Sequence, residues 1–419
     1  MNPTPLFLPC AAGAEPLLAD EVRAILLAAG TARAADSVKA ARGGVALVGS
    51  IQTAMRLHLE SRLAQRVLWQ VAEGPYQGED DLYELARTVR WAEWIRPKQT
   101  LRVDTTAQRS PLKSLHFASL RIKDAVCDGM REATGDRPDV DPRFPDLSLV
   151  LHLQETHALL YVDLTGEALF KRGWREDKGE APLKETLAAA MLAAAGWQGR
   201  EEDGILLDPC CGAGTIAIEA AQIACGIAPG MQRSFAFEKL GPFRMETAAV
   251  AWRDMKAEAR ARVHAPLVMV QGGDVSFRMT DFATRNAERA GVLHAIEFKT
   301  ADALQRVAPA DHGVLMLNPP YGERIDAKGT GSGHDPHAGM AREGFEGGGT
   351  SQAFFSALAS HWKHQYAGWT AWVLSPDAKL PQAMRLKESR RVPMWNGPIE
   401  CRLFRFDLVK GSNRSDPRR

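Results

Sequence analysis

Residues 318–324 read Asn-Pro-Pro-Tyr-Gly-Glu-Arg and stand directly after an apolar run, Gly313 to Leu317. The run predicts a buried strand, and ligands of open parallel sheets bind at the carboxyl ends of the strands. The amide oxygen of Asn318 and the carbonyl of Pro319 offer two acceptors on a stiff backbone. Such a pair grips an exocyclic NH2 group and turns its lone pair toward an electrophile. We therefore expect this loop to carry out transfer to a planar amine.

Four residues of the loop are expected to be catalytic, and they are Asn318, Pro319, Pro320 and Tyr321. The ring of Tyr321 supplies a flat surface on which a base can stack. An ordinary Pro-Pro turn after a strand is the structural alternative. Asparagine before the prolines and Tyr-Gly after them favour the catalytic interpretation.

A second turn is a candidate binding site for the molecule that carries the electrophile. Ile205 to Leu207 is a short apolar strand candidate, and it is followed by Asp208-Pro209-Cys210-Cys211-Gly212-Ala213-Gly214-Thr215 and a run of helix formers. Strand, glycine-rich turn and helix are typical of a nucleotide-binding unit. The two glycines let the backbone approach a ligand closely. The third glycine of the dinucleotide fingerprint is absent, because Ile218 stands there, and this disfavours pyrophosphate binding.

These two strings resemble motif I and the catalytic loop of class I S-adenosylmethionine-dependent methyltransferases that modify exocyclic amines. Residues 171–175, 181–186 and 227–238 are similar to segments of THUMP-containing RNA methyltransferases. The resemblance extends from about residue 5 to about residue 410. It is greatest to the bacterial enzymes that methylate the N2 amine of a guanine in 23S ribosomal RNA. It implies S-adenosylmethionine as cofactor and ribosomal RNA as partner.

The resemblance also assigns cofactor-binding roles. It implies that the turn at 212–215 lines the methionine end of the cofactor, with Asp208 under the turn. Asp274 is implied to hold the ribose hydroxyls, and Asp302 the adenine amine. Taken alone, each acidic residue could equally be a turn residue or a helix cap. The implied cofactor set is Asp208, Cys210, Gly212, Gly214, Thr215, Asp274, Asp302 and Asn318.

The spacing between motif I and Asp274 departs from the usual pattern of such enzymes. Some fifty residues separate the two, and the stretch from about 225 to 266 predicts an inserted helix. If Glu238 were the ribose ligand instead, the assignment of Asp274 would be wrong.

The order of apolar runs predicts an α/β fold with a doubly wound parallel, Rossmann-like sheet, preceded by an α+β region. The strands of that sheet are expected at 205–207, 267–270, 296–299, 314–317 and 369–374. The expected domains are a ferredoxin-like element at 1–60, a THUMP RNA-binding domain at 61–168, the methyltransferase domain at 169–410 and a basic tail at 411–419. A Gly-rich stretch within 328–350 is expected to be an insertion, with closure over substrate as the alternative.

Charge is uneven although the formal net charge is only +1. Between Arg87 and Lys123 nine basic residues face two acidic ones, and residues 384–419 are basic as well. Local patches can bind phosphates even in a nearly neutral chain, because screening confines charge effects to about 10 Å. A solvated face is the alternative for either run. The RNA contacts expected by charge are Arg109, Lys113, Arg121 and Lys123.

The six cysteines show no zinc spacing, so no metal is expected. The first residues lack a secretory signal and no run is long enough to span a bilayer, which predicts a reducing cytoplasm. Catalysis by a thiolate of Cys210 or Cys211 is disfavoured, because an amine has its own lone pair and needs no covalent adduct. The proton acceptor is not identified, and Glu323 is a candidate only by proximity.

Three other functions remain open. One is a tRNA guanine-N2 methyltransferase, since amine and cofactor would be identical. Another is methylation of DNA adenine or protein glutamine, against which the RNA-module resemblance argues. The last is a noncatalytic RNA-binding assembly protein, which the intact motifs disfavour.

Overall fold

The computed structural model describes residues 3–179, 182–319 and 351–409. The chain divides into two compact units. The first comprises residues 1–172 and 228–262, and the second comprises residues 173–227 and 263–419. The segment 228–262 therefore belongs with the N-terminal part of the chain. The division into three domains and a tail stays a prediction. None of the helices in the described ranges is long and apolar enough to cross a membrane.

The first unit contains one mixed sheet in the order β2-β3-β1-β4-β8-β7-β5-β6. Its strands are β1 (Thr4–Pro9), β2 (Lys39–Ala41), β3 (Gly44–Gly49), β4 (Leu68–Pro75), β5 (Thr100–Ala107), β6 (Asp139–Val140), β7 (Leu147–Leu153) and β8 (His157–Asp163). β1 pairs antiparallel with both β3 and β4, whereas β5 pairs parallel with β7. The strands before residue 50 thus continue the sheet that the later strands form. The last two strands, β7 and β8, pair antiparallel as a hairpin.

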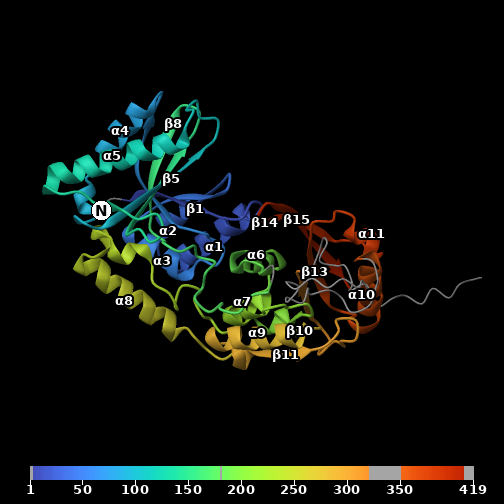
Figure 1. Ribbon diagram of the computed structural model, residues 1–419. Coiled ribbons are helices and arrows are strands. Elements are labelled where there is room, and N and C mark those ends of the chain that lie inside the picture. The colour runs from blue at the N-terminus through green and yellow to red at the C-terminus, as the bar shows by residue number, and fades with distance from the viewer. Residues whose placement is uncertain (1–2, 180–181, 320–350, 410–419) are drawn as a thin grey trace, which may run out of the picture. The chain divides into compact units, whose positions relative to one another are not determined.

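The helices of this unit are α1 (Glu15–Ala28), α2 (Ala32–Asp36), α3 (Ile51–Glu60), α4 (Glu79–Arg87), α5 (Leu115–Thr134) and α8 (Glu246–Ala261). Figure 1 shows α4 and α5 lying side by side. α5 begins where the Ser114 hydroxyl accepts a hydrogen bond from the Phe117 amide, and it ends at Gly135 in the left-handed conformation. Its residues Val126 and Met130 are buried, while Leu120 is only half-buried.

The inserted helix predicted after residue 225 is confirmed as α8. It packs on α3 in the first unit (Figure 1). Arg56 bonds Glu258 over 2.9 Å, and Arg262 bonds Glu60 over 2.8 Å. Upstream of α8 the chain passes so close to the end of α3 that a Cβ at Gly230 would lie 2.5 Å from a backbone oxygen. These contacts fasten the inserted segment to the first unit.

The second unit contains a sheet in the order β11-β10-β9-β12-β13-β15-β14. Its strands are β9 (Ile205–Asp208), β10 (Val270–Asp274), β11 (Ile296–Thr300), β12 (Gly313–Leu317), β13 (Thr370–Ser375), β14 (Arg390–Asn396) and β15 (Ile399–Asp407). The five strands from β11 to β13 are parallel, as predicted. β15 pairs antiparallel with β13, and β14 pairs antiparallel with β15 at the edge of the sheet. The strand predicted at 267–270 starts later, because Leu267 and Met269 lie exposed ahead of β10.

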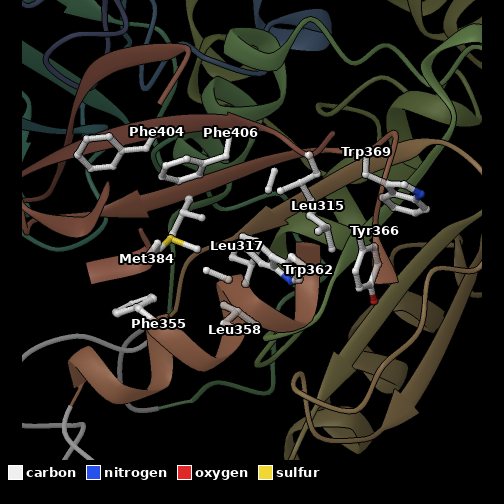
Figure 2. Packing of buried hydrophobic residues seen from close by; sticks show 14 of the residues in the cluster. Leu315, Leu317, Phe355, Leu358, Trp362, Tyr366, Trp369, Met384, Phe404 and Phe406 are labelled. Carbon is white, nitrogen blue, oxygen red and sulfur yellow. The ribbon is translucent and has the colours of Figure 1, made fainter. Parts of the chain in front are cut away.

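Helices cover both faces of this sheet, which confirms the doubly wound arrangement. They are α6 (Glu185–Ala195), α7 (Thr215–Ala224), α9 (Phe277–Arg289), α10 (Ser351–Gln365) and α11 (Leu380–Met384). Figure 2 shows Leu317 of β12 beside Trp362 of α10, and Phe404 of β15 belongs to the same buried cluster. Met316 lies between Leu315 and Leu317 and is equally buried, so it points to the opposite face. Burial on both faces holds β12 rigid up to the residue where the candidate loop begins.

Candidate active site

The two candidate loops lie at one edge of the second unit's sheet. β9 and β12 pair parallel, with Leu315 opposite Leu207. The turn that follows Asp208 and the loop that begins at Asn318 therefore leave neighbouring strands at the same end. This adjacency is the arrangement that transfer between a bound donor and a bound amine requires.

The turn after β9 is shaped by two glycines with positive φ, +51° at Gly212 and +87° at Gly214. A Cβ at Gly214 would lie 2.9 Å from the Cβ of Ala283 in α9, whereas a Cβ at Gly212 would meet no atom within 4 Å. The Cys211 amide donates to the Gly273 carbonyl over 2.7 Å and binds the turn to β10. Gly214 is thus required for packing, and Gly212 leaves its backbone open to a ligand.

Asp274 ends β10 and faces this turn. Its Oδ2 accepts a hydrogen bond from the Gly212 amide over 3.0 Å, and its Oδ1 accepts one from the Ser276 amide over 2.9 Å. Burial raises the pKa of Asp274, and the two hydrogen bonds oppose that shift. Each carboxylate oxygen keeps lone-pair capacity for a further donor such as a ribose hydroxyl.

Glu238, the other candidate for the ribose, lies in the first unit. Its Oε1 accepts a hydrogen bond from the Phe235 amide over 2.9 Å, within the 3-10 turn η3 (Ala236–Lys239). It therefore caps a turn in a different unit from the one that holds motif I. Asp274, in contrast, bonds the turn itself, and the ribose role stays a prediction.

Three acidic residues act on one thiol at this edge. Burial raises the pKa of Cys210 well above its ordinary value, and Asp208, Asp274 and Asp302 raise it further. Burial likewise raises the pKa of Cys211 well above its ordinary value. Since a thiolate is the nucleophilic form, both thiols are poorly suited to covalent catalysis.

Asp208 itself is fully buried beneath the turn. Burial, with the nearby Asp274, raises the pKa of Asp208 to about 8, although the Cys210 amide donates to its Oδ1 over 3.1 Å. Asp302 is half-buried and its Oδ1 accepts a hydrogen bond from the Leu304 amide over 2.8 Å. Asp208 thus supports the turn from its buried side, while the half-buried Asp302 is accessible at the edge of the sheet.

Asn318 has an unusual environment for a polar side chain. Its Oδ1 is buried and has no hydrogen-bond partner among the described residues. A buried acceptor without a partner costs roughly 1–3 kcal/mol, and an incoming donor that bonds it would remove this cost. The neighbouring Pro319 is buried. Pro320 and Tyr321 lie outside the described residues, as do Glu323 and the Gly-rich stretch within 328–350.

Sequence reasoning gave no role to two polar side chains that build this site. Asn286 in α9 is fully buried, and its Nδ2 donates to the carbonyls of Asp177 and Ala213 over 3.0 and 3.1 Å. Arg306 donates to the Gly272 carbonyl over 3.0 Å and to Gln271 Oε1 over 2.9 Å. The one available signal was the position of Asn286 on the buried stripe of α9, where Thr280 is the other polar residue.

The basic residues expected to contact RNA lie in the first unit and differ in their surroundings. Arg121 bonds Asp80 over 2.7 Å and lies over the Tyr83 ring, and Lys123 bonds its neighbour Asp124 over 2.8 Å. Arg109 and Lys113 are exposed in the loop before α5. Those two are therefore the more available phosphate contacts, and their role stays a prediction.

A cavity of about 250 Å³ lies elsewhere in the first unit. Three basic side chains line it, from Arg96, Lys239 and Arg244, together with the acidic Glu93. Lys239 also bonds Asp146 over 3.2 Å. The sequence did not point to this cavity, because its walls come from segments far apart in the chain.

Family models match three successive parts of the chain. They are the RlmL ferredoxin-like domain at residues 5–68, the THUMP domain at residues 76–163 and the RMKL-like methyltransferase domain at residues 172–333. The three matches follow one another without overlap and include both candidate loops.

Curated relatives are similar over nearly the whole chain. "Ribosomal RNA large subunit methyltransferase K/L" of Shewanella baltica (strain OS195) is 35% identical over 389 residues, which cover 91% of this chain and 51% of the relative. The protein of the same name from Syntrophotalea carbinolica is 36% identical and covers 97% of this chain and 54% of its own. The chain thus spans about half the length of the curated relatives it matches.

Solved structures share the fold. SMU.472, described as "a putative methyltransferase complexed with SAH", has a TM-score of 0.80 at 24% identity and covers 98% of this chain and 100% of its own. TrmN from Thermus thermophilus has a TM-score of 0.66 at 19% identity and covers 97% of this chain and 99% of its own. At these identities the likeness concerns the fold alone.

Proposed function

We propose that this chain, which carries a ferredoxin-like domain, a THUMP domain and an RMKL-like methyltransferase domain, methylates the exocyclic N2 amine of a guanine in 23S ribosomal RNA. S-adenosylmethionine is the proposed cofactor, and when bound it supplies a methyl group already activated by its sulfonium.

The single observation that carries the proposal is the Oδ1 of Asn318 after β12, which is buried and has no partner within residues 3–179, 182–319 and 351–409. An exocyclic amine is a donor that would satisfy this acceptor. With the Pro319 carbonyl as second acceptor, the amine would be held with its lone pair toward the turn after β9. The acceptors would also stabilise the positive charge that develops on the nitrogen during transfer. The guanine has to be unstacked to reach such a pocket.

The residues around the turn fit the cofactor. The backbone at Gly212 is open to a ligand, and Thr215 starts α7 beside it. Asp274 has lone pairs left for ribose hydroxyls, and Asp302 is accessible for the adenine amine. Donor and acceptor groups thus match both ends of S-adenosylmethionine.

The choice of 23S ribosomal RNA is supported by the names of the curated relatives and by the THUMP domain. Because the chain spans about half of those relatives, the substrate is part of the proposal. A guanine in tRNA would present the same amine to the same acceptors and is the main competing substrate.

The proposal is tested by incubating the purified chain with S-adenosylmethionine and one nucleic acid at a time. The substrates are 23S ribosomal RNA and tRNA, both from a strain that lacks the gene, and DNA. Mass spectrometry of the nucleosides is expected to find N2-methylguanosine in the 23S RNA alone. Methylation only of tRNA, or only of adenine in DNA, would show that the proposed substrate is wrong. Absence of methylation with all three nucleic acids would reject the proposed activity.

A further inference from the structure

Arg175 lies inside the second unit with part of its guanidinium unused. Its side chain is only 9% exposed. Nε donates to Glu185 Oε1 over 2.8 Å, and one terminal nitrogen, Nη2, donates to the Leu183 carbonyl over 3.0 Å and to Thr215 Oγ1 over 2.7 Å. The other terminal nitrogen, Nη1, is buried and has no partner among the described residues. A buried guanidinium nitrogen in this state is a vacant donor for an anion.

The same place carries a second source of positive potential. Thr215 is the first residue of the ten-residue helix α7, and Gly214 at the N-cap provides no side-chain cap. The first amides of a helix have no partner within the helix, and the helix dipole favours a negative group there. Arg175 is bonded to the side chain of that first residue, so its free nitrogen and the uncapped amides belong to one anion site.

The segment that bears Arg175 is fixed to the turn by α9. Arg289 Nε donates to the Trp174 carbonyl over 3.0 Å, and its Nη2 donates to Asp177 Oδ2 over 2.6 Å. Asn286 bonds both the Asp177 carbonyl and the Ala213 carbonyl of the turn. The position of the guanidinium is therefore set before any ligand binds, which reduces the entropy lost on binding.

We propose that Arg175 binds the carboxylate of the cofactor's methionyl group and thereby selects cofactors that carry it. This inference rests on the proposed function, since it takes S-adenosylmethionine as the ligand. Planar guanidinium and carboxylate groups pair well, and the pair is strong when water is excluded. Glu185 occupies the far side of the guanidinium through Nε and orients it. Burial raises the pKa of Glu185, and Arg175 opposes that shift.

The test compares two ligands that differ by this carboxylate. Calorimetry measures binding of S-adenosylhomocysteine and of S-adenosyl-3-thiopropylamine, which lacks the carboxylate and keeps the amine. The wild type is expected to bind the first about 10- to 100-fold more tightly. Arg175→Gln is expected to lose that preference by weakening only the carboxylate ligand. Lys178→Gln, an exposed cation on the same segment, is the matched control and should keep the full preference.

Thermal unfolding of each variant checks that it is folded. Because Arg175→Gln leaves Glu185 buried without its cation, the double variant Arg175→Gln/Glu185→Gln is measured alongside. Equal binding of the two ligands by the wild type, or a preference that persists in a folded Arg175 variant, would overturn the inference alone. If the wild type binds neither ligand, the proposed function falls and the inference falls with it.

Discussion

The Gly212 amide donates a hydrogen bond to Asp274 Oδ2 over 3.0 Å, which joins the turn after β9 to the end of β10. Asp274 is half-buried, and the Ser276 amide bonds its other oxygen. One carboxylate therefore holds the turn in place and keeps lone pairs directed to the edge of the sheet. Asp274 thus has two roles, which are to shape the turn and to accept a ligand. Measurements of stability and of ligand affinity can separate them.

Asp274→Asn is expected to lower the affinity for S-adenosylhomocysteine by about 10- to 100-fold, the effect of losing hydrogen bonds to a charged acceptor. Calorimetry measures the affinity, and denaturant unfolding measures stability separately. Asp281→Asn changes a half-exposed carboxylate on the adjacent α9 and should leave the affinity intact. Undiminished affinity in folded Asp274→Asn would reject the ribose role.

Gly214→Ala is expected to destabilise the protein more than Gly291→Ala does. Both glycines have positive φ, where an alanine costs about 1–2 kcal/mol. Only at Gly214 would the new Cβ meet a neighbour, Ala283 Cβ at 2.9 Å, which adds about 1–3 kcal/mol of overpacking. Denaturant unfolding measures both variants. In a double-mutant cycle Ala283→Gly should remove the extra cost, and additive effects would show that the contact is not the cause.

Asn318→Ala is expected to lower kcat by about 10²- to 10³-fold, because it removes a positioned acceptor that acts on the amine. Binding of S-adenosylhomocysteine should change little. Single-turnover methylation and calorimetry give the two quantities. Ser375→Ala is the control, since Ser375 ends the neighbouring strand β13 and its hydroxyl already accepts a bond from the Asp377 amide. An active Asn318→Ala enzyme would refute the assigned role.

Asp208→Asn is expected to stabilise the ligand-free protein increasingly as pH rises. The pKa of Asp208 is raised from an ordinary 3.8 to about 8, so between these values the folded state keeps a proton that the unfolded state loses. Wild-type stability then falls with rising pH by at most about 1.4 kcal/mol per unit from this group, and the decline ends above pH 8.

The asparagine variant removes this contribution and keeps an acceptor for the Cys210 amide. Denaturant unfolding at several pH values between about 5 and 8 follows the difference between the two proteins. Burial raises the pKa of Asp274 too, but Asp274 is present in both proteins. A difference that does not change with pH would show that Asp208 is ionised throughout.

Removal of Arg109 and Lys113 is expected to weaken RNA binding uniformly and to reduce its salt dependence. Two lost phosphate contacts should lower the slope of log K against log salt by about 1.5. Fluorescence anisotropy with a 23S RNA fragment measures this slope. The pair Arg33→Ala/Lys39→Ala changes two exposed cations of the same unit and serves as the control. If both pairs alter the slope equally, the Arg109 and Lys113 loop has no special role.

Part of the fold was predictable because strands buried on both faces are continuous apolar runs, as β9 and β12 are. β14 and β15 were not predicted, because they are antiparallel and half exposed, and β14 carries two arginines and Pro393. The turn between them did hold a signal, since Asn396 is followed by Gly397, which adopts a φ of +62°.

The residues of the candidate site were likewise predictable only in part. Asp208 and Asn318 were recognisable because each follows an apolar run directly, and Asp274 because it stands four residues after the predicted strand 267–270. Asn286 and Arg175 were not, because their roles come from contacts over large separations in sequence. Arg175 meets Thr215 across forty residues, and Asn286 meets Ala213 across seventy-three. No pattern within a short stretch of sequence indicates which distant segments come into contact.

Residues 228–262 belong to the first unit although they follow β9 and α7 in the chain, and this affects the order in which the two units can fold during synthesis. Phe237 and Trp252 from this segment pack together, and Phe237 also packs against His58, which is fully buried. The N-terminal unit is therefore unfinished when β9 and α7 leave the ribosome. Nascent chains commonly complete one domain before the next appears. Here the order is interleaved, because β9 is synthesised before residues 228–262. The first strand of the catalytic sheet therefore stays unpaired while the N-terminal unit completes its fold.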